Sequence, residues 1–319
     1  MLASQFLSTE LKEFDNTFNE AVKSHIPLLD IIMQYVARRK GKQLRPIFVL
    51  LTAKMCGKVT EQSYRAAALI ELLHTATLVH DDVVDDAETR RGFFSINAIW
   101  KNKIAVLVGD YLLSKGLLLS LGNGDFTILQ ILSTAVKEMS EGELLQLEKS
   151  RKLDITEEVY FEIIKAKTAS LISSACAAGA YSSSADKVLS DKCKLLGENI
   201  GMAFQIKDDL FDYGTMDVGK PTGNDIKEKK VTLPLIYTMQ QCDARTKSKI
   251  KYILKNNNKD KKDVQFIIDK VIKTGGVEYA ETVMKKFINN AYALLNDWPA
   301  SEAKEVMKDL INYTIDRKK

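Results

Sequence analysis

Apolar side chains recur every three or four residues along almost the whole chain, which is the spacing that lines one face of an α-helix. The pattern is already clear at Leu11, Phe14 and Phe18. Pro46 stands where a first helical turn accepts it and Gly57 where a helix ends, so a helix is predicted between them. The remaining predicted helices cover about residues 62–85, 102–121, 126–149, 186–213, 226–241, 245–256, 261–273, 277–296 and 301–316.

Polar or flexible residues separate these helices. A polar bend is predicted at residues 90–92, and the pair Asp154 and Glu157 is predicted to cap the helix that follows. A loop rich in Gly, Thr and Lys is expected over residues 214–224. No fixed-period repeat is found, which argues against a solenoid.

Helix breakers are scarce. The 319 residues include 5 Pro and 16 Gly, and no Pro lies between residues 47 and 220. A β-sandwich or barrel needs many more turns than this composition provides. No Ser-, Gly- or Pro-rich linker and no shift in composition divides the chain, so the sequence predicts a single all-α domain, a large helical bundle over residues 1–319.

Charge and cysteine content exclude several classes of protein. Lys and Arg number 46 against 42 Asp and Glu, too small an excess to indicate a nucleic-acid-binding protein. The basic segment 247–262 alternates lysines with Asn and Asp and has few aromatic residues, so it is interpreted as a solvated helix connection. The four cysteines are widely spaced, which indicates neither a zinc site nor a disulfide framework.

The predicted cellular location rests on two kinds of segment that the sequence does not show, a signal peptide and a membrane-spanning stretch. The first ten residues lack the basic and apolar regions of a signal peptide. The longest uncharged stretch, residues 168–185, contains seven Ser and Thr residues, so no membrane-spanning segment is predicted. These features predict a cytoplasmic protein, and they leave peripheral contact with a membrane, for example for product release, open.

The strongest chemical signal is an acidic cluster at the end of the helix predicted over residues 62–85. Asp81, Asp82 and Asp85 occupy positions i, i+1 and i+4, so on a helix their carboxylates share one patch of surface. Like charges this close favour a bound cation, and all-oxygen ligands favour Mg²⁺. Taken alone, the cluster is equally well interpreted as a solvated acidic helix end.

The same spacing recurs at the end of the helix predicted over residues 186–213. Asp208, Asp209 and Asp212 again occupy positions i, i+1 and i+4. An EF-hand loop does not explain either cluster, because its alternating ligands and central Gly are absent. The repetition predicts two groups of Mg²⁺ ligands that face each other across a cavity and hold a diphosphate.

Basic residues occur where an anionic ligand of these clusters would need them. Arg offers bidentate geometry to phosphate oxygens and Lys a point charge, although each such residue alone is usually a solvated surface charge. His74 precedes Asp81 by two helical turns and lies on nearly the same face, from which it could donate to a phosphate oxygen. The basic residues are Lys42, Arg45, Arg90, Arg91, Lys167, Lys220 and Lys230.

Eight motifs are distributed along nearly the whole chain. They are Gly41-Lys42-Gln43-Leu44-Arg45-Pro46, Glu71-Leu72-Leu73-His74, the two acidic clusters, Arg90-Arg91-Gly92, Lys167-Thr168, Phe204-Gln205 and Lys230-Val231-Thr232-Leu233-Pro234. Together they resemble the motifs of the trans-isoprenyl diphosphate synthases, and in particular of the long-chain polyprenyl type. The resemblance implies the all-α isoprenoid-synthase fold with a central cavity, dependence on Mg²⁺, and a homodimer.

The resemblance also implies a role for each motif residue. The diphosphate of isopentenyl diphosphate would be bound by Lys42, Arg45, His74 and Arg91. The Mg²⁺ ions that hold the diphosphate of the second substrate, an allylic prenyl diphosphate, would be bound by Asp81, Asp82, Asp85, Asp208, Asp209 and Asp212. That diphosphate would be neutralised by Arg90, Lys167, Lys220 and Lys230. The residues that face the allylic cation would be Thr168 and Gln205.

Two further positions bear on the loop and on the product. Lys229 stands where the family often has Gly, which leaves the course of the loop before Lys230 undetermined. Ala76 and Thr77 lie just ahead of the first acidic cluster and are small where short-chain members of the family carry bulky aromatic residues. The growing chain is therefore expected to pass between helices, giving a product of heptaprenyl to nonaprenyl length.

Three other functions compete with this interpretation. A terpene cyclase would share the first acidic cluster but usually has Asn, Ser and Glu in its second metal motif. A non-catalytic subunit of a heteromeric synthase would typically lack some of the acidic or basic residues, all of which are present here. A synthase of shorter products, farnesyl or geranylgeranyl diphosphate, is the third.

Overall fold

The fold is all-α, as the sequence predicts. The computed structural model describes residues 2–38, 41–90, 92–214 and 223–316. The chain divides into two compact units. The first comprises Met1–Val136, Ser174–Lys194 and Ala300–Met307, and the second comprises Lys137–Ser173, Leu195–Pro299 and Lys308–Lys319.

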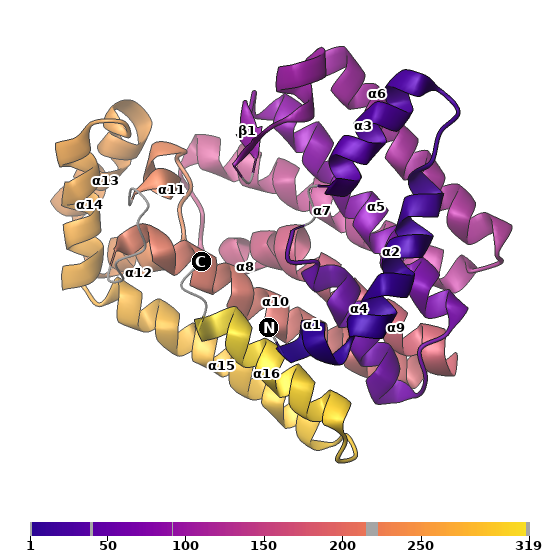
Figure 1. The fold of residues 1–319 in the computed structure, drawn as a ribbon. Coiled ribbons are helices and arrows are strands. Elements are labelled where there is room, and N and C mark those ends of the chain that lie inside the picture. Colours follow the sequence, from indigo (N-terminus) through magenta and orange to yellow (C-terminus); the bar gives the residue numbers. More distant parts are fainter. Residues whose placement is uncertain (1, 39–40, 91, 215–222, 317–319) are drawn as a thin grey trace. The chain divides into compact units, whose positions relative to one another are not determined.

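The core of the first unit forms around α5, which packs against α2, α4 and α6 (Figure 1). The side chain of Thr60 caps the start of α5 by accepting the backbone N–H of Ser63, whose own side chain accepts the backbone N–H of Thr60. Residues such as Leu69, Ile70 and Leu72 are fully buried, because helices cover α5 on several sides. The helices are α1 (Leu2–Phe6), α2 (Ser8–Val22), α3 (Pro27–Arg38), α4 (Leu44–Cys56), α5 (Glu61–Val84) and α6 (Ile96–Gly122).

Glycines let α6 approach α5 closely. A Cβ at Gly116 would lie 2.9 Å from Cδ1 of Leu69, and one at Gly109 would lie 2.1 Å from Nε2 of His80. Both distances are shorter than carbon atoms in contact tolerate, so only Gly fits at these two positions without rearrangement. This close packing fixes the end of α5 that carries the first acidic cluster.

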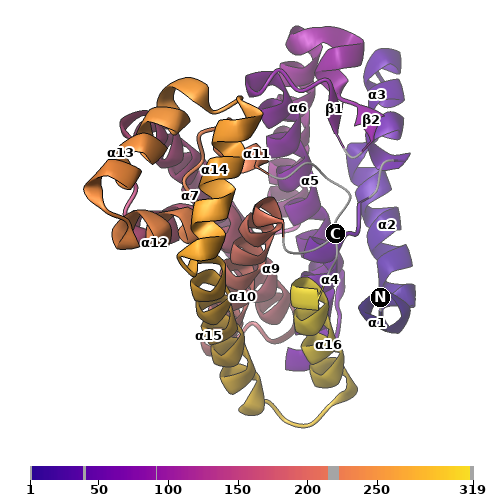
Figure 2. The ribbon, with the colours of Figure 1, turned by 90° about the vertical axis from the view of Figure 1, so that its left-hand side faces the viewer.

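The second unit contains a layer of helices in which α12 packs against α8, α14 and α15 (Figure 2). Four helices contribute residues to both units: α7 (Phe126–Lys152), α9 (Ser170–Ser184), α10 (Lys187–Leu210) and α16 (Glu302–Asp316). The others are α8 (Glu157–Ile164), the π-helix η1 (Lys165–Ala169), the 3₁₀ turn η2 (Phe211–Tyr213), α11 (Asn224–Lys227), α12 (Leu233–Gln241), α13 (Ala244–Tyr252), the π-helix η3 (Ile253–Asn257), α14 (Lys261–Lys273) and α15 (Gly276–Asn296).

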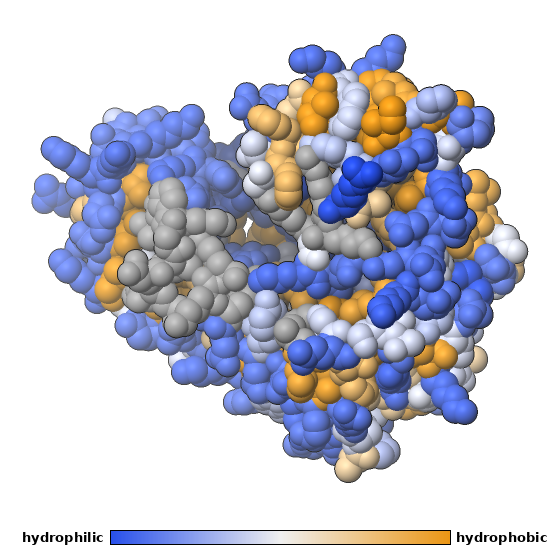
Figure 3. All heavy atoms as spheres, in the orientation of Figure 1, coloured by the Kyte–Doolittle hydropathy of each residue, from blue (hydrophilic) through white to orange (hydrophobic). Residues whose placement is uncertain are grey.

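The surface of α13 and of the start of α14 is hydrophilic, as Figure 3 shows. Lys247, Lys249 and Lys251 are exposed. The ammonium of Lys249 lies 3.8 Å from the centre of the Phe266 ring. The lysines of this segment are therefore a solvated face with one cation–π contact.

One predicted element around the motifs is extended by the structure and another is wrong. The polar bend predicted at residues 90–92 belongs to a short antiparallel hairpin, in which β1 (Thr89–Arg90) pairs with β2 (Phe93–Phe94). The next helix begins at Ile96 instead of residue 102, and it contains a break at Lys101, whose φ of 72° is left-handed. The spacing of apolar residues predicts neither feature. The strands of the hairpin are only two residues long, and the break in the helix involves the single residue Lys101.

Two predicted helix boundaries in the second unit are also wrong. The helix predicted over residues 226–241 is two helices, α11 and α12, separated at Lys229, where φ is 60°. The left-handed backbone interrupts the helix, and Pro234 begins the next one. Asp154 and Glu157 do not cap α8, because the cap is Thr156, whose hydroxyl accepts the backbone N–H of Val159.

The helix α6 is more apolar than the sequence pattern predicts. Within the described ranges, this helix alone is long and apolar enough to span a membrane, and 33% of its most apolar stretch is buried in the fold. Val106, Leu107, Leu117, Leu118 and Leu121 are all more than two-fifths exposed. They recur at helical spacing, so they form one exposed apolar face, here called the α6 face.

Candidate functional site

The first acidic cluster lies at the C-terminal end of α5, where the helix dipole is already negative. Asp81 and Asp85 are exposed and lie one helical turn apart. Asp82 is buried, and its Oδ1 accepts a hydrogen bond from Nε of Arg90 at 2.5 Å. The cluster therefore combines exposed carboxylates with a buried one that an arginine neutralises.

The hairpin that carries Arg90 is tied to the end of α5. The side-chain amide of Asn97 donates to the backbone oxygens of Asp82 at 3.1 Å and of Ala87 at 3.2 Å. The hydroxyl of Ser95 donates to the oxygen of Ala87 at 2.5 Å. These bonds explain why a hairpin this short is ordered, because a two-stranded ribbon alone is at best marginally stable in water.

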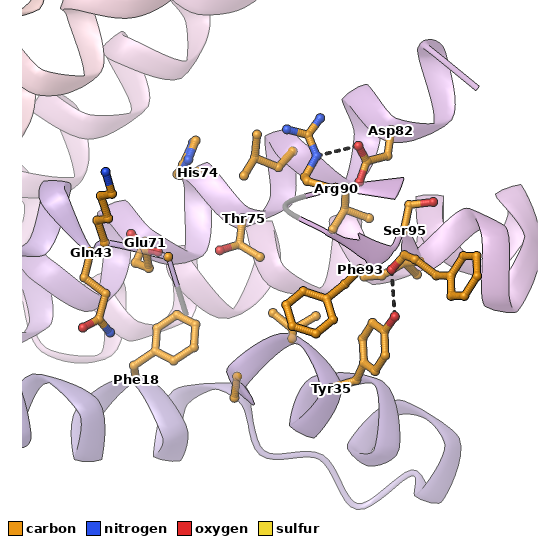
Figure 4. A pocket seen from close by; sticks show the side chains of 18 of the residues that line it. Phe18, Tyr35, Gln43, Glu71, His74, Thr75, Asp82, Arg90, Phe93 and Ser95 are labelled. Carbon is orange, nitrogen blue, oxygen red and sulfur yellow. Dashed lines mark hydrogen bonds and ion pairs between the residues drawn. The ribbon is translucent and has the colours of Figure 1, made fainter. Parts of the chain in front are cut away.

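A second attachment joins the hairpin to α3. The hydroxyl of Tyr35 donates to the backbone oxygen of Phe94 at 2.7 Å (Figure 4). The ring of Tyr35 also meets that of Trp100 edge to face, with centroids 5.0 Å apart. Arg90 is thus positioned from two sides, and its neighbour Arg91 lies outside the described residues.

A cavity of about 500 Å³, here called the first cavity, lies next to the hairpin. Figure 4 shows its lining, with His74 and Thr75 on α5, Phe18 on α2 and Tyr35 on α3. Three of the predicted phosphate-binding residues are brought together here. They are Lys42, His74 and Arg90. Arg45 is half-buried at the start of α4 and is not part of this lining.

The second acidic cluster is at the end of α10. Its middle carboxylate, Asp209, accepts hydrogen bonds from two residues of the second unit. Oδ2 of Asp209 accepts the hydroxyl of Tyr160 at 2.6 Å, and Oδ1 accepts the side-chain amide of Gln205 at 2.8 Å. Burial raises the pKa of Asp209 to about 7, although both hydrogen bonds oppose the shift. Gln205 accepts in turn from the hydroxyl of Thr168 at 2.6 Å, so two predicted residues join one network.

The other two carboxylates of this cluster have different surroundings. Asp212 is buried, and its oxygens accept the backbone N–H groups of Asn224 at 2.7 Å and Asp225 at 2.9 Å. Burial raises its pKa despite these bonds. Asp208 is half-buried. Asp212 therefore closes the loop onto the start of α11, a structural role that its spacing in the sequence does not reveal.

Lys167 and Thr168 lie in the π-helix η1, a widened turn between α8 and α9. Such turns are frequent at functional sites because they redirect side chains within a helix. Nζ of Lys167 forms an ion pair with Glu143 and donates to Oε1 of Gln146 at 3.5 Å. A Cβ at Gly201 would lie 2.5 Å from Cα of Ala169, which shows how closely α10 passes this turn.

A cavity of about 260 Å³, the second cavity, collects these residues within the second unit. Its lining joins five predicted residues, which are Lys167, Thr168, Gln205, Asp209 and Lys230. Burial alone would lower the pKa of Lys230, but the hydrogen bond and charge of Glu228, 2.6 Å away, raise it.

Asp225 and Tyr160 also line the second cavity, and sequence reasoning missed both. Burial raises the pKa of Asp225 to about 8, and the charges of Asp209 and Asp212 add to the shift. A fourth carboxylate, five residues before Lys230, was a visible signal in the sequence, but Asp225 lies outside the repeated spacing. Tyr160 gave no signal, since its partner is 49 residues away in the chain.

The chain makes a left-handed turn at Lys229, just before Lys230. Lys229 adopts φ of 60°, a conformation that Gly reaches without strain. Its Nζ donates to the backbone oxygen of Lys255 at 3.3 Å. A lysine therefore forms this turn, and its side chain anchors the turn to η3. Lys220 lies outside the described residues.

The residues predicted to set product length lie on α5 in the first unit, Ala76 in the core and Thr77 half-buried. Ala76 is fully buried, and the hydroxyl of Thr77 donates to the backbone oxygen of His74 at 2.8 Å. Neither lines the first or the second cavity. Leu69, a turn or two earlier, packs onto Gly116 of α6.

Within the part of the chain that the structure describes, no three His, Cys, Asp or Glu side chains are grouped so that they hold a metal ion by themselves. The structure instead places exposed carboxylates at the end of α5 and half-buried Asp208 at the end of α10. Basic residues line both cavities, Lys42 and Arg90 the first and Lys167 and Lys230 the second. A metal ion at either helix end of this all-α protein would need additional ligands, such as the oxygens of a phosphate.

Comparisons with known proteins agree with this class. A family profile described as polyprenyl synthetase matches residues 26–271. Heptaprenyl diphosphate synthase component 2 from Geobacillus stearothermophilus is 33% identical over 97% of this chain and 96% of its own length. Geranylgeranyl diphosphate synthase from Saccharolobus solfataricus is 32% identical over the full length of both chains.

Solved structures are similar over nearly the whole fold. A decaprenyl diphosphate synthase from Rhodobacter capsulatus superimposes with a TM-score of 0.94 at 32% identity, covering 99% of this chain and 98% of that one. A polyprenyl synthase from Caulobacter crescentus, complexed with calcium and isoprenyl diphosphate, gives 0.89 at 30% identity, covering 99% and 97%. The chain therefore belongs to the polyprenyl synthetase family of trans-prenyltransferases.

The raised pKa of Asp209 predicts a pH dependence of stability. An unfolded Asp has a pKa of about 4, whereas in the fold this carboxyl titrates at about 7. The folded protein therefore binds the extra proton between these values, and the contribution of Asp209 to the free energy of unfolding falls as pH rises through that window.

We expect Asp209→Asn to flatten this dependence. The measurement is urea unfolding of the metal-free protein in EDTA between pH 5 and pH 8, compared with Asp191→Asn, which changes an exposed Asp on the same helix. A slope in Asp209→Asn equal to those of the wild type and of Asp191→Asn would show that Asp209 is not the titrating group.

Proposed function

We propose that this protein condenses isopentenyl diphosphate with an allylic prenyl diphosphate, using Mg²⁺, to make a long-chain all-trans polyprenyl diphosphate. The observation that carries the proposal is the end of α5. There, exposed Asp81 and Asp85 lie one turn apart beside a hairpin that brings Arg90 to buried Asp82. The polyprenyl synthetase family supplies the reaction type.

The residues present suit Mg²⁺. Both acidic clusters stand at helix C-termini, where the helix dipole adds to the negative charge and favours a cation. Mg²⁺ usually takes one or two carboxylates and completes its shell with water and substrate phosphates, so a pair such as Asp81 and Asp85 is sufficient when a diphosphate is bound. Asp208 is the corresponding ligand of the second cluster, and the solved relative from Caulobacter crescentus contains calcium with isoprenyl diphosphate.

The engaged carboxylates take supporting roles in this proposal. Asp82 holds Arg90, Asp209 is bonded to Tyr160 and Gln205, and Asp212 is bonded to the start of α11. Each can share a remaining lone pair with a metal ion. Their main contribution is to fix the helix ends on which Asp81, Asp85 and Asp208 stand.

The first unit would bind isopentenyl diphosphate. Lys42 and His74 line the first cavity together with Arg90, and Arg45 lies at the start of α4. Arg91 follows Arg90 in the sequence and is assigned to the same diphosphate. Lys and His supply point donors to the phosphate oxygens, and Arg supplies paired ones.

The diphosphate of the allylic substrate would be held by Mg²⁺ on the two acidic clusters and neutralised in part by Arg90. Bound Mg²⁺ would stabilise the charge that develops on the leaving diphosphate. Lys167 and Lys230, both lining the second cavity, would add fixed positive charge, as would Lys220. The oxygens of Thr168 and Gln205, joined by a 2.6 Å hydrogen bond, would lie against the carbocation.

The chemistry requires no nucleophilic side chain. Breaking the allylic C–O bond leaves a carbocation and a diphosphate, and the alkene of isopentenyl diphosphate attacks the cation. The new cation then loses a proton, which the departed diphosphate accepts. The protein's residues bind the two diphosphates, stabilise the departing one and exclude water.

Product length is the finer part of the proposal. Relatives at about the same identity include a heptaprenyl and a geranylgeranyl diphosphate synthase. Small Ala76 and Thr77 below the first acidic cluster favour a product of heptaprenyl to nonaprenyl length. The alternatives are a shorter product and a non-catalytic subunit.

The activity is tested with the purified protein alone. With Mg²⁺, farnesyl diphosphate and radiolabelled isopentenyl diphosphate, we expect incorporation of label into an acid-labile product that becomes extractable as lipid. Asp81→Asn should reduce this rate more than about a hundredfold, because a metal-bound charge opposite the leaving group is lost.

The matched control for this test is Asp86→Asn. Asp86 is an exposed neighbour of the cluster with a φ of 48°, a conformation that Asn also adopts readily. We expect it to keep most of the activity. Absence of incorporation by the wild-type protein alone would indicate a non-catalytic subunit. Equal losses of activity in Asp81→Asn and Asp86→Asn would show that Asp81 has no specific role.

Product length is tested by mass spectrometry of the extracted lipids. We expect the wild type to make heptaprenyl to nonaprenyl diphosphate and Ala76→Phe to make a shorter product, because an aromatic ring in this fully buried position fills the path between helices. Ala76→Ser adds little volume and should leave the length unchanged. Farnesyl diphosphate as the wild-type end product would contradict the long-chain assignment.

We also propose that the protein is a homodimer through the α6 face. An exposed apolar stripe of this length is unusual on a monomer and typical of an interface. Asp110 lies on the same face and is exposed, which suits a protein partner better than the interior of a bilayer. The α6 face would thus be covered by the same face of a second copy.

The dimer is tested by sedimentation. The wild type should sediment as a dimer without detergent, and Leu118→Glu on the α6 face should shift it toward monomer. The control is Val188→Glu on α10. Val188 is 66% exposed and Leu118 is 65% exposed, and we expect the control variant to remain a dimer. A monomeric wild type, or a wild type that stays in solution only with detergent, would contradict this interface.

A further inference from the structure

Two cysteines that are 137 residues apart in the sequence meet in the first unit. Cys56 is the last residue of α4, and Cys193 lies near the start of α10. Their Sγ atoms are 3.7 Å apart. Both are free thiols, as is Cys176 of α9. The wide spacing of the cysteines in the sequence predicts no disulfide, so this contact is created by the tertiary structure alone.

The helix α9 fixes the backbones that carry the two thiols. Gly179 of α9 lies so close to α4 that an added Cβ would be 2.2 Å from a backbone oxygen of α4. The hydroxyl of Ser190 on α10 donates to the backbone oxygen of Ala177 at 3.0 Å. Just beyond the end of α4, the hydroxyl of Thr60 donates to the backbone oxygen of Ser182 at 3.0 Å. The contact between the sulfur atoms therefore belongs to a well-supported part of the fold.

The thiols of this pair differ in their access to solvent. Cys193 is fully buried, whereas Cys56 is half-buried. The hydrogen bond to Cys56 and burial both raise the pKa of the Cys193 thiol, so Cys193 keeps its proton at neutral pH. Burial likewise raises the pKa of Cys176. A small reagent from solvent therefore reaches Cys56 first, and Cys193 is the neighbour with which an oxidised Cys56 can react.

The geometry of the pair suits a disulfide better than a metal site. Disulfide sulfurs are about 2.05 Å apart, so the Sγ atoms, now 3.7 Å apart, must approach by about 1.7 Å. Rotation of the two side chains can supply so short an approach. A structural zinc ion takes four ligands, and among the described residues no group of three or more His, Cys, Asp or Glu side chains is placed to hold a metal.

We propose that Cys56 and Cys193 are a modification site that hydrogen peroxide converts into an intramolecular disulfide. Peroxide first oxidises the Cys56 thiol to a sulfenic acid and releases one water molecule. The Sγ of Cys193 then attacks the Sγ of Cys56, and the hydroxyl of the sulfenic acid leaves with the thiol proton as a second water molecule. In total, two electrons and two protons pass from the thiols to the peroxide, and a dithiol reductant reverses the change.

The disulfide would stabilise the first unit. It would join α4 to α10 across 137 positions of the chain, and a cross-link that closes so long a loop restricts the unfolded state. In a reducing compartment the pair remains as thiols, and the disulfide forms only while an oxidant is present. Neither cysteine lines the first or the second cavity, so the proposal does not rest on the proposed function.

The test is oxidation of the folded, full-length protein. The wild type is reduced, freed of reductant and treated with hydrogen peroxide, after which the remaining thiols are alkylated and the protein is digested without reduction. We expect mass spectrometry to find the Cys56 peptide joined to the Cys193 peptide, and dithiothreitol to separate them. The melting temperature of the oxidised protein should exceed that of the reduced protein by about 3 °C or more.

Cys193→Ala and Cys242→Ser are the matched variants. Cys242 is half-buried like Cys56 but lies in the second unit, at the end of α12. Each variant is compared with its own reduced form, so any effect of the substitution itself on stability cancels. Cys193→Ala should lose both the joined peptide and the rise in melting temperature, and Cys242→Ser should keep both. Cys56→Ser, at a half-buried helix end, should repeat the loss if Cys193→Ala does not fold.

Several results would overturn the proposal. One is oxidation of Cys56 to a sulfinic acid while Cys193 is still recovered as a free thiol. Others are a joined peptide that contains Cys176 or Cys242 in place of Cys193, or a disulfide between two chains on a non-reducing gel. A joined peptide without a rise in melting temperature would contradict the stabilising effect. Failure of the proposed function would show separately, as absent condensation by the reduced protein with Mg²⁺.

Discussion

Crowded carboxylates at the C-terminal ends of apolar helices are the constraint on which this structure depends. Both α5 and α10 end in three aspartates, where the helix dipole already disfavours negative charge. The fold reduces this unfavourable negative charge in three ways. Asp82 forms an ion pair, Asp209 is buried with a raised pKa, and Asp212 accepts backbone N–H groups. Asp81 and Asp85 are left at the surface of the same helix end, which is where a cation lowers the energy most. The proposed metal ions would add positive charge at these same helix ends.

Each compensation also builds a part of the site. The ion pair of Asp82 fixes the hairpin and hence the first cavity, and Tyr35 fixes the hairpin from the opposite side. The bonds of Asp209 align Gln205, and through it Thr168 on the widened turn of η1. Asp212 closes the chain onto α11, near Lys229 and Lys230. Stability and proposed function therefore rest on the same contacts, and a change at one carboxylate is expected to alter both.

Much of this could be predicted from the sequence, for identifiable reasons. The long helices follow from apolar periodicity and from the scarcity of Pro and Gly, because these are local properties. The repeated i, i+1, i+4 spacing of aspartates is also local, so it located both clusters. The errors occur where local signals are weak. The hairpin is two residues long on each strand, the break between α11 and α12 depends on one left-handed residue, and the cap of α8 is Thr156 rather than its charged neighbours.

The sequence by itself determined the all-α class, the two acidic helix ends and the family, because each is written in the order and spacing of residues along the chain. Only the tertiary structure distinguished the carboxylates from one another, since burial and hydrogen-bond partners come from segments distant in sequence, such as Tyr160 for Asp209. It also revealed Asp225 in the second cavity and the aromatic lining of the first, which joins α2, α3 and the hairpin. Spacing along a helix reports which side chains share a face. It carries no information about what packs against that face.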